Sequence, residues 1–306
     1  MTQIAQFLGG VALGEPVSFG GLTLFPLRSA QPRDADYDIL PVAITTGTAR
    51  VTEVSQGGSV PELLIETKGG RPVLAIDGEE LIGAKQNRVV NVSILLAAQA
   101  QTRIPVSCTE AGRWRHESPE FMASPQAMYP EARARKVRDV SATLKSQRSY
   151  RGDQGAVWHS IDSKLGAMGQ AAPTRAMSEL YAGRSGTIEE FVRAFAPVEG
   201  QVGAVYAIGG RVVGLDGFDA PSTWRAYAPR LVRGYALDAL STVAPAPVPR
   251  DAAAAWLADL GLDPVESYPG VGLGETLRFT GARVHGSALW AEGRVMHLVA
   301  FAARNN

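Results

Sequence analysis

The residue types best suited to chemistry are concentrated in one short stretch, residues 77–88. Largely apolar segments precede it at 73–76 and follow it at 89–96, and both are typical of buried strands. The stretch holds three carboxylates, two cations and two amides, namely Asp77, Glu79, Glu80, Lys85, Arg88, Gln86 and Asn87. Sites are commonly built where a polar loop meets a packed scaffold, so this stretch is the first candidate site.

The carboxylates of this stretch could bind a divalent cation or exchange protons with a substrate. Hard cations such as Mg²⁺ or Mn²⁺ prefer carboxylate oxygens, and Asp77 and Glu79 would face the same side of a strand. Glu79 or Glu80, if partly desolvated, could instead act as a general acid or base beside Lys85. The alternative interpretation is a turn whose acids pair with Lys85 or Arg88. We therefore treat Glu79, Glu80 and Lys85 as catalytic candidates, and Asp77 and Glu79 as candidate metal ligands.

The following segment combines donors of different shape with an alternating pattern. Apolar residues at 90, 92, 94 and 96 would lie on one face of a strand, and Asn87, Asn91 and Ser93 on the other. A guanidinium group can bind a phosphate in a forked geometry, and amides can recognise a sugar or base. A polar network that fixes strand register is the alternative. The ligand-binding candidates are Gln86, Asn87, Arg88, Asn91, Arg113, Tyr150, Arg151, Asp153 and Gln154.

The last four of these candidates end or follow a basic region, from Arg133 to Arg151. It contains seven basic residues and one acid. A phosphate-bearing ligand would suit this charge, and so would single-stranded nucleic acid stacked on Trp114 or Tyr150. The third interpretation of this basic region is a helix face exposed to solvent. Residues 149–154 also precede a predicted helix, whose N-terminus favours anions.

The cysteine, histidine and glycine residues exclude several kinds of site. A single cysteine, Cys108, excludes an internal disulfide and cysteine-rich zinc sites, and the four histidines show no zinc-binding spacing. We expect Cys108 at a strand end near the core rather than as a nucleophile. Glycines at 270, 272 and 274 lack the Lys-Ser or Lys-Thr pair of a phosphate loop, so we expect a tight irregular turn.

Composition is that of an ordinary soluble protein. The chain has 306 residues, of which 45% are hydrophobic and 20% charged. Its 30 basic and 30 acidic residues balance, which argues against extended nucleic-acid binding. The first residues lack a secretory pattern, and no apolar stretch reaches the roughly 20 residues that a spanning helix needs. We expect a cytoplasmic protein with no membrane partner.

The element pattern predicts an α+β fold in one compact domain, residues 1–306. Residues 1–125 read as a β-rich sandwich or barrel-like sheet, 126–200 as mainly helical, and 201–306 as mixed, with a C-terminal strand pair packing back. Glycine pairs predict three hairpins, at 17–25, 63–76 and 204–215. Helix N-caps are expected at Asp153 and Thr174, and a capping box at Thr187. A helix is expected from 222 to 240, interrupted near Pro229.

Several stretches together resemble one known family. They are 60–64 (Val-Pro-Glu-Leu-Leu), 77–81 and 83–88, 105–108 leading to 112–114 (Gly-Arg-Trp), 150–154, 234–239 and 269–275. The chain resembles the ARG and rhodanese-phosphatase superfamily associated protein domain family of bacteria and archaea, over nearly its whole length. The family name implies association with ADP-ribosylglycohydrolase and phosphatase-type proteins, and hence ADP-ribose or phosphate-ester chemistry. The resemblance implies no particular catalytic residues.

Two functions follow from these patterns. The first is binding of a small anionic ligand, a nucleotide or an ADP-ribose-like molecule, in a polar cleft, with a hydrolytic step left open. The second is a non-catalytic binding or scaffold protein whose polar cluster is structural. The two differ in geometry: a site requires residues 77–88 to meet Arg113 and residues 150–154 in one concave pocket.

Overall fold

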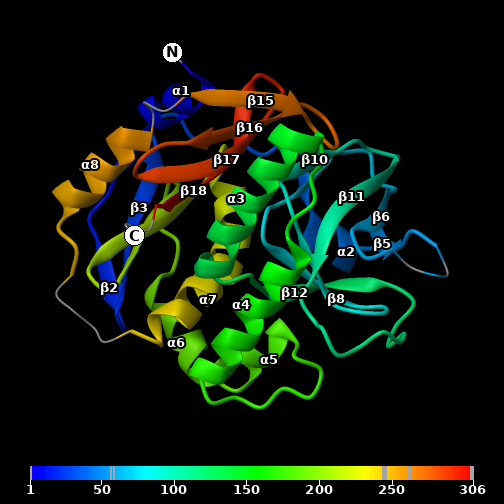
Figure 1. The fold of residues 1–306 in the computed structure, drawn as a ribbon. Helices are drawn as coiled ribbons and strands as arrows, with labels where there is room; N and C mark the ends of the chain where they lie inside the picture. The colour runs from blue at the N-terminus through cyan, green and yellow to red at the C-terminus, as the bar shows by residue number, and fades with distance from the viewer. Residues whose placement is uncertain (1, 56, 58, 243–246, 261–263, 304–306) are drawn as a thin grey trace.

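A computed structural model describes residues 2–55, 57, 59–242, 247–260 and 264–303, and it shows an α+β protein (Figure 1). The helices are α1 (Gln3–Gly9), α2 (Leu40–Thr45), α3 (Pro130–Gln147), α4 (Gln154–Ala167), α5 (Met177–Ala182), α6 (Ser185–Ala194), α7 (Pro221–Ala239) and α8 (Arg250–Leu260). No helix in these residues is long and apolar enough to cross a membrane.

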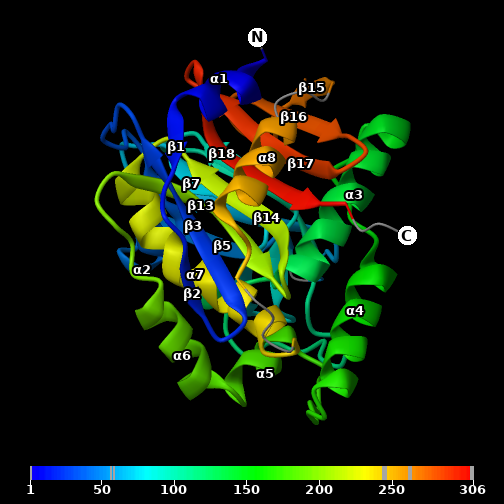
Figure 2. The same ribbon diagram turned by 90° about the vertical axis from the view of Figure 1, so that its left-hand side faces the viewer.

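One large antiparallel sheet contains strands from both the N-terminal and the C-terminal parts of the chain (Figure 2). Its strands are β1 (Val11–Leu13), β2 (Val17–Phe19), β3 (Leu22–Ser29), β13 (Gln201–Ile208), β14 (Arg211–Phe218), β15 (Val265–Pro269), β16 (Glu275–Thr280), β17 (Val284–Ala291) and β18 (Arg294–Ala302). The order is β1-β3-β13-β14-β18-β17-β16-β15, with β2 paired to β3. The predicted return of the C-terminal strands onto the rest of the chain is therefore confirmed.

A second sheet of six strands is curled into a half-barrel, in agreement with the barrel-like sheet predicted for residues 1–125. It contains β5 (Ala49–Glu53), β6 (Glu62–Thr67), β8 (Glu79–Gly83), β9 (Arg88–Val90), β11 (Gln101–Cys108) and β12 (Phe121–Ala127), in the order β12-β8-β9-β11-β6-β5. Its edge strands β5 and β12 approach each other, and the Arg50 guanidinium lies 2.8 Å from the Glu120 carboxylate across that gap. Apolar side chains such as Ile65 and Val106 fill its concave side.

The hairpin predicted at 63–76 is wrong. A third sheet, in the order β10-β7-β4, takes β7 (Val73–Ala75) away from β6 and pairs it with β10 (Ile94–Leu96) and β4 (Asp38–Ile39). Two-residue hairpin turns of this type need positive φ, which the glycine pairs at 20–21 and 209–210 have and the pair at 69–70 lacks. The other two predicted hairpins are confirmed as β2–β3 and β13–β14.

The prediction that one strand continues past residue 90 is also wrong. β9 ends at Val90, and after residues 91–93 the chain enters a different sheet as β10. Asn87, Asn91 and Ser93 therefore do not share an open face, and all three are buried. The alternating pattern failed because helices and a second sheet cover both sides of this segment.

Helix boundaries agree with the sequence where a side chain caps the helix. Asp153 caps α4, accepting a hydrogen bond of 3.0 Å from the Ala156 amide. Thr174 and Thr187 do not cap, since α5 begins after Ala176 and α6 after Arg184. α7 continues through Pro229, whose cost of roughly 3 kcal/mol in a helix interior must be offset by the buried face of this helix.

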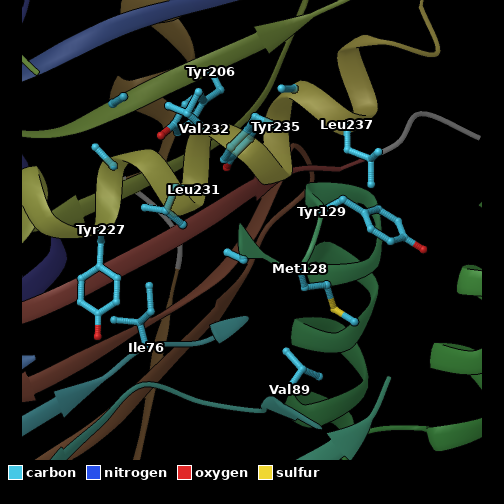
Figure 3. Close-up of a cluster of buried hydrophobic side chains, with 14 of the residues drawn as sticks. Ile76, Val89, Met128, Tyr129, Tyr206, Tyr227, Leu231, Val232, Tyr235 and Leu237 are labelled. Carbon is cyan, nitrogen blue, oxygen red and sulfur yellow. The ribbon is translucent and has the colours of Figure 1, made fainter. Parts of the chain in front are cut away.

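α7 forms the centre of the largest apolar cluster. Figure 3 shows Tyr206 of β13 on one side of the helix and Ile76 and Val89 on the other, with Tyr227 and Tyr235 projecting from the helix itself. The rings of Tyr206 and Tyr235 stack with centroids 3.6 Å apart. α7 therefore connects the large sheet to the two smaller ones through apolar packing.

The glycine-rich segment at 270–274 is the tight turn expected, and it fastens the large sheet to β10. The Leu273 amide donates to the Leu95 carbonyl at 2.7 Å, and the Gly270 amide donates to the Gly274 carbonyl at 2.9 Å. A Cβ atom at Gly272 would lie 2.2 Å from the Leu95 carbonyl oxygen. The backbones of the two segments can thus approach only because residue 272 is glycine.

We predict that Gly272→Ala lowers the free energy of unfolding by about 1–3 kcal/mol, because the new methyl group forces these backbones apart. Gly166→Ala is the matched control, since nothing lies within 4 Å of a Cβ there and α4 should gain roughly 0.5–1 kcal/mol. Urea unfolding monitored by circular dichroism measures both. Equal stability of the two variants would contradict the close approach.

Candidate functional site

Asp77 lies in the interior, in contact with two cations of α3. Its carboxylate accepts from Lys136 Nζ at 2.5 Å and from Arg133 Nε at 3.3 Å, and none of the three side chains is more than 1% exposed. Figure 1 shows why: α3 stands between the large sheet and the curled sheet. Asp77 therefore anchors the helix to the turn that leads into β8.

Arg133 continues this contact to the large sheet. Its Nη1 and Nη2 donate to the Asp216 carboxylate of β14 at 3.2 and 2.8 Å. Burial alone would raise the pKa of Asp216, but the charge of Arg133 and the hydrogen bonds from Arg133 and His297 together hold that pKa below its usual value. Arg133 is consequently a buried cation shared by two carboxylates from different sheets.

Further hydrogen bonds close this chain of contacts into a ring. His297 Nε2 lies 3.3 Å from the Asp216 carboxylate, and its Nδ1 lies 2.7 Å from Ser93 Oγ. Ser93 Oγ in turn accepts from the Asp77 amide at 3.0 Å. Asp77, Arg133, Asp216, His297 and Ser93 thus form one buried polar ring, which we call the central ring.

Glu79 and Glu80 point to opposite sides of β8 and are both fully buried. Glu79 Oε2 accepts from the Tyr227 hydroxyl and the Ile76 amide, each at 3.2 Å, while Glu80 accepts from Thr109, Ser124 and Gln126 at 2.9–3.1 Å. Burial raises the pKa of each carboxyl group to about 7. A pKa near neutrality would suit a general acid, but neither group faces a cavity among those described.

The candidate metal ligands also diverge. Asp77 is held by Arg133 and Lys136, whereas Glu79 is held by Tyr227 on the side of α7. Among the described residues, no group of three or more His, Cys, Asp or Glu side chains could hold a metal ion. The geometry therefore gives a cation at Asp77 and Glu79 no shared position, because strand spacing is broken by the turn at Gly78.

Residues 86–88 and Arg113 form a second interior network at the end of the curled sheet, with the partly exposed Lys85 beside it. Asn87 Oδ1 accepts from Arg113 Nη2 and from the Gly83 amide, each at 3.1 Å, and Arg113 also donates to Glu110 at 2.6 Å. Lys85 reaches the Gly57 carbonyl at 2.7 Å. Sequence reasoning grouped Asn87 with Arg113 correctly in space, and their polar atoms bind each other.

Arg88 lies inside the curled sheet, opposite Cys108 in register. Its Nη1 donates to the carbonyl and side-chain oxygens of Gln86 at 3.1 and 3.2 Å, and its Nη2 lies 3.8 Å from the Glu53 carboxylate. Burial raises the pKa of the Cys108 thiol to about 11, against the opposing effect of Arg88. The thiol is thus protonated at neutral pH, which does not suit a nucleophile.

The remaining candidates fasten the start of α4 to the curled sheet. The Gln154 side chain forms two hydrogen bonds with the Cys108 backbone, at 2.7 and 2.9 Å. Asn91 donates to the Tyr150 carbonyl at 3.1 Å and accepts from Ser107 at 2.9 Å. Asp153 caps α4, and of this group Arg151 and Asp153 are exposed.

A groove lies elsewhere, between α3, α4 and the β13–β14 hairpin. It has a volume of about 800 Å³, and none of the sequence-derived candidates lines it. Its charged and hydroxyl residues are Glu131, Arg135, Arg138, Ser160, Lys164, Arg211, Asp238, Ser241 and Thr242. The basic region of α3 was the only sequence signal for it; the residues from α4, β14 and α7 were missed because they are far apart in the chain.

The floor of the groove is an ordered polar cluster. Lys164 Nζ lies 2.6 Å from the Asp238 carboxylate and 3.8 Å from that of Glu131. The Tyr129 hydroxyl and Ser160 Oγ are 2.8 Å apart, and Figure 3 shows this tyrosine pointing away from the apolar cluster. Lys164 is therefore fixed, whereas the arginines at the rim are exposed.

Comparison with known proteins gives one match. The model of the ARG and Rhodanese-Phosphatase-superfamily-associated Protein domain matches residues 10–301, and the chain belongs to this family. No curated protein and no solved structure matches significantly.

We predict that Glu79→Gln changes how stability depends on pH. With a pKa near 7 in the fold and 4.5 in the unfolded chain, native Glu79 keeps a proton that the unfolded chain has released. Stability of the wild type should thus fall as pH rises from 4.5 to 7, by about 1 kcal/mol per pH unit from this group. The variant should lose that part of the slope.

Urea unfolding at pH 5, 6, 7 and 8 measures the slope for both proteins. Glu190→Gln, at an exposed position of α6, controls for the removal of a carboxylate. Parallel pH profiles for wild type and Glu79→Gln would show that burial does not raise this pKa.

Proposed function

We propose that this member of the ARG and Rhodanese-Phosphatase-superfamily-associated Protein domain family binds a small, phosphate-bearing anion in the groove beside α3. One observation carries the proposal: three exposed arginines at the rim, Arg135, Arg138 and Arg211, make no hydrogen bond or ion pair with any other described residue. Free guanidinium groups around a hollow are suited to forked binding of phosphate oxygens.

The charge of the groove supports an anion. Four cations line it (Arg135, Arg138, Lys164 and Arg211), against two carboxylates that both lie beside Lys164. The remaining positive charge belongs to the arginines. A volume of about 800 Å³ falls within the roughly 300–1,000 Å³ that is usual for small-molecule sites.

A nucleotide or ADP-ribose-like ligand suits the mixture of groups. Phosphates would bind the arginines, while Ser160, Ser241 and Thr242 offer hydroxyls for the sugar. The family name points to the same chemistry, through ADP-ribosylglycohydrolase and phosphatase-type proteins. We propose binding alone, because Glu131 and Asp238 lie beside Lys164, and the described residues of the groove include no other carboxylate that could act as a general base.

A scaffold role is a second candidate, and a separate observation favours it. The polar residues of the 77–88 stretch other than Lys85, and Arg113, are buried and pair with one another, with cations of α3 and with backbone groups. In that reading the stretch maintains the fold, and the protein acts through its surface. A ligand test separates the two roles, because only the first requires a small molecule to bind in the groove.

We predict that the double variant Arg138→Ala/Arg211→Ala weakens binding of ADP-ribose or AMP at least tenfold. Each charge-assisted hydrogen bond contributes roughly 1.5–3 kcal/mol, and a factor of ten in affinity needs about 1.4 kcal/mol. Isothermal titration calorimetry of ADP-ribose, AMP and inorganic pyrophosphate measures the affinities. Arg103→Ala, an exposed arginine on β11 outside the groove, is the matched control and should bind as the wild type does.

Two results would contradict the proposal. One is a wild type that folds well yet binds none of the three ligands. The other is a double variant that binds as tightly as Arg103→Ala. The first result favours the scaffold role, and the second places the ligand somewhere other than the groove.

A further inference from the structure

Arg278 of β16 is a fully buried cation without a partner. It is 2% exposed, and none of its three side-chain nitrogens forms a hydrogen bond with a described residue. Thr276, two residues earlier on the same face of β16, is 3% exposed, and its hydroxyl also lacks a partner. Buried polar groups in proteins are nearly always satisfied, and an unpaired buried charge is especially unfavourable.

The neighbouring charges cannot serve Arg278, because they are already paired. Lys136 uses its three protons on Asp77 and the carbonyls of residues 90 and 91, at 2.5, 3.1 and 3.1 Å. Asp77 and Asp216 accept from Arg133 as well. The charge of Asp77 acts on Arg278 favourably and that of Lys136 unfavourably, so Arg278 lies at the edge of the central ring.

Counting charges shows an excess. The interior between α3 and the large sheet holds three cations, Arg133, Lys136 and Arg278, against two carboxylates, Asp77 and Asp216. His285 of β17 faces the same interior, where its Nε2 lies 3.0 Å from the Ala134 carbonyl of α3. Burial lowers the pKa of His285 to about 4, so this side chain is neutral at pH 7. At least one positive charge therefore lacks a buried counter-charge among the described residues, because Glu266, opposite Arg278 on β15, is exposed and bound by Lys145.

We propose that Arg278 binds one small monovalent inorganic anion, of the size of chloride or nitrate, in the interior beside the central ring. A single negative charge balances the excess, and the guanidinium nitrogens and the Thr276 hydroxyl supply donors on one face of β16. This internal site is distinct from the groove, where the arginines are exposed and the space suits a larger ligand.

The test measures thermal unfolding in increasing chloride, with sodium gluconate keeping the ionic strength constant. It uses the Arg135→Ala/Arg138→Ala/Arg211→Ala background, so that the free arginines of the groove are removed. We expect a saturable rise of a few degrees in the unfolding midpoint, and loss of that rise in Arg278→Met. Arg283→Met, which removes an arginine whose side chain is 78% exposed, is the matched control and should retain the rise.

A crystal grown in bromide provides a second measurement that needs no variant. An anomalous peak within hydrogen-bonding distance of the Arg278 guanidinium supports the proposal. Absence of that peak, or a chloride effect that is the same in Arg278→Met and Arg283→Met, would overturn it. Should Arg278→Met fail to fold, the bromide experiment on the unmodified chain decides.

Discussion

The contact of Arg133 with both Asp77 and Asp216 is the interaction on which the rest of the structure depends. Asp77 comes from the turn before β8, Asp216 from β14 in the large sheet, and Arg133 from the helix between them. Placing charges in the interior is unfavourable unless each is paired and hydrogen-bonded. The requirement to satisfy all three side chains therefore fixes the position of α3 relative to both sheets, and the central ring extends that requirement to β18 through His297.

The periodicity of α3 divides its charges between two tasks. Arg133 and Lys136 face the interior, on the side of the helix that also buries Val140. Glu131, Arg135 and Arg138 lie on the opposite side, spaced as i, i+4 and i+7, and line the groove. The central ring fixes the position of α3. Because α3 is fixed, Arg135 and Arg138 on its outer side have defined positions along the groove. The same basic segment thus supports both the fold and the proposed binding site.

Much of the fold could be predicted from the sequence, because its signals are local. Two of the three hairpins predicted from paired glycines, the Asp153 cap and the run of C-terminal strands depend on neighbours a few residues away. The third hairpin, at 63–76, failed because β7 pairs with distant strands instead. The role of the 77–88 stretch could not be predicted in this way, because the partners of Arg133 lie 56 and 83 residues from it in the chain. A carboxylate beside a turn looks the same in sequence whether it faces solvent or a buried arginine. For the same reason the groove was missed, since five distant segments form it.

The central claim is that Arg133 and Asp216 act as one buried unit joining α3 to the large sheet. A double-mutant cycle with Arg133→Met and Asp216→Asn, measured by urea unfolding, tests it most directly. Each single change should destabilise the protein by roughly 3–5 kcal/mol, because it removes the main partner of the other buried charge. The double variant should then be less destabilised than the sum of the two by at least about 2 kcal/mol. Additive effects, or single changes below about 1 kcal/mol, would contradict the account.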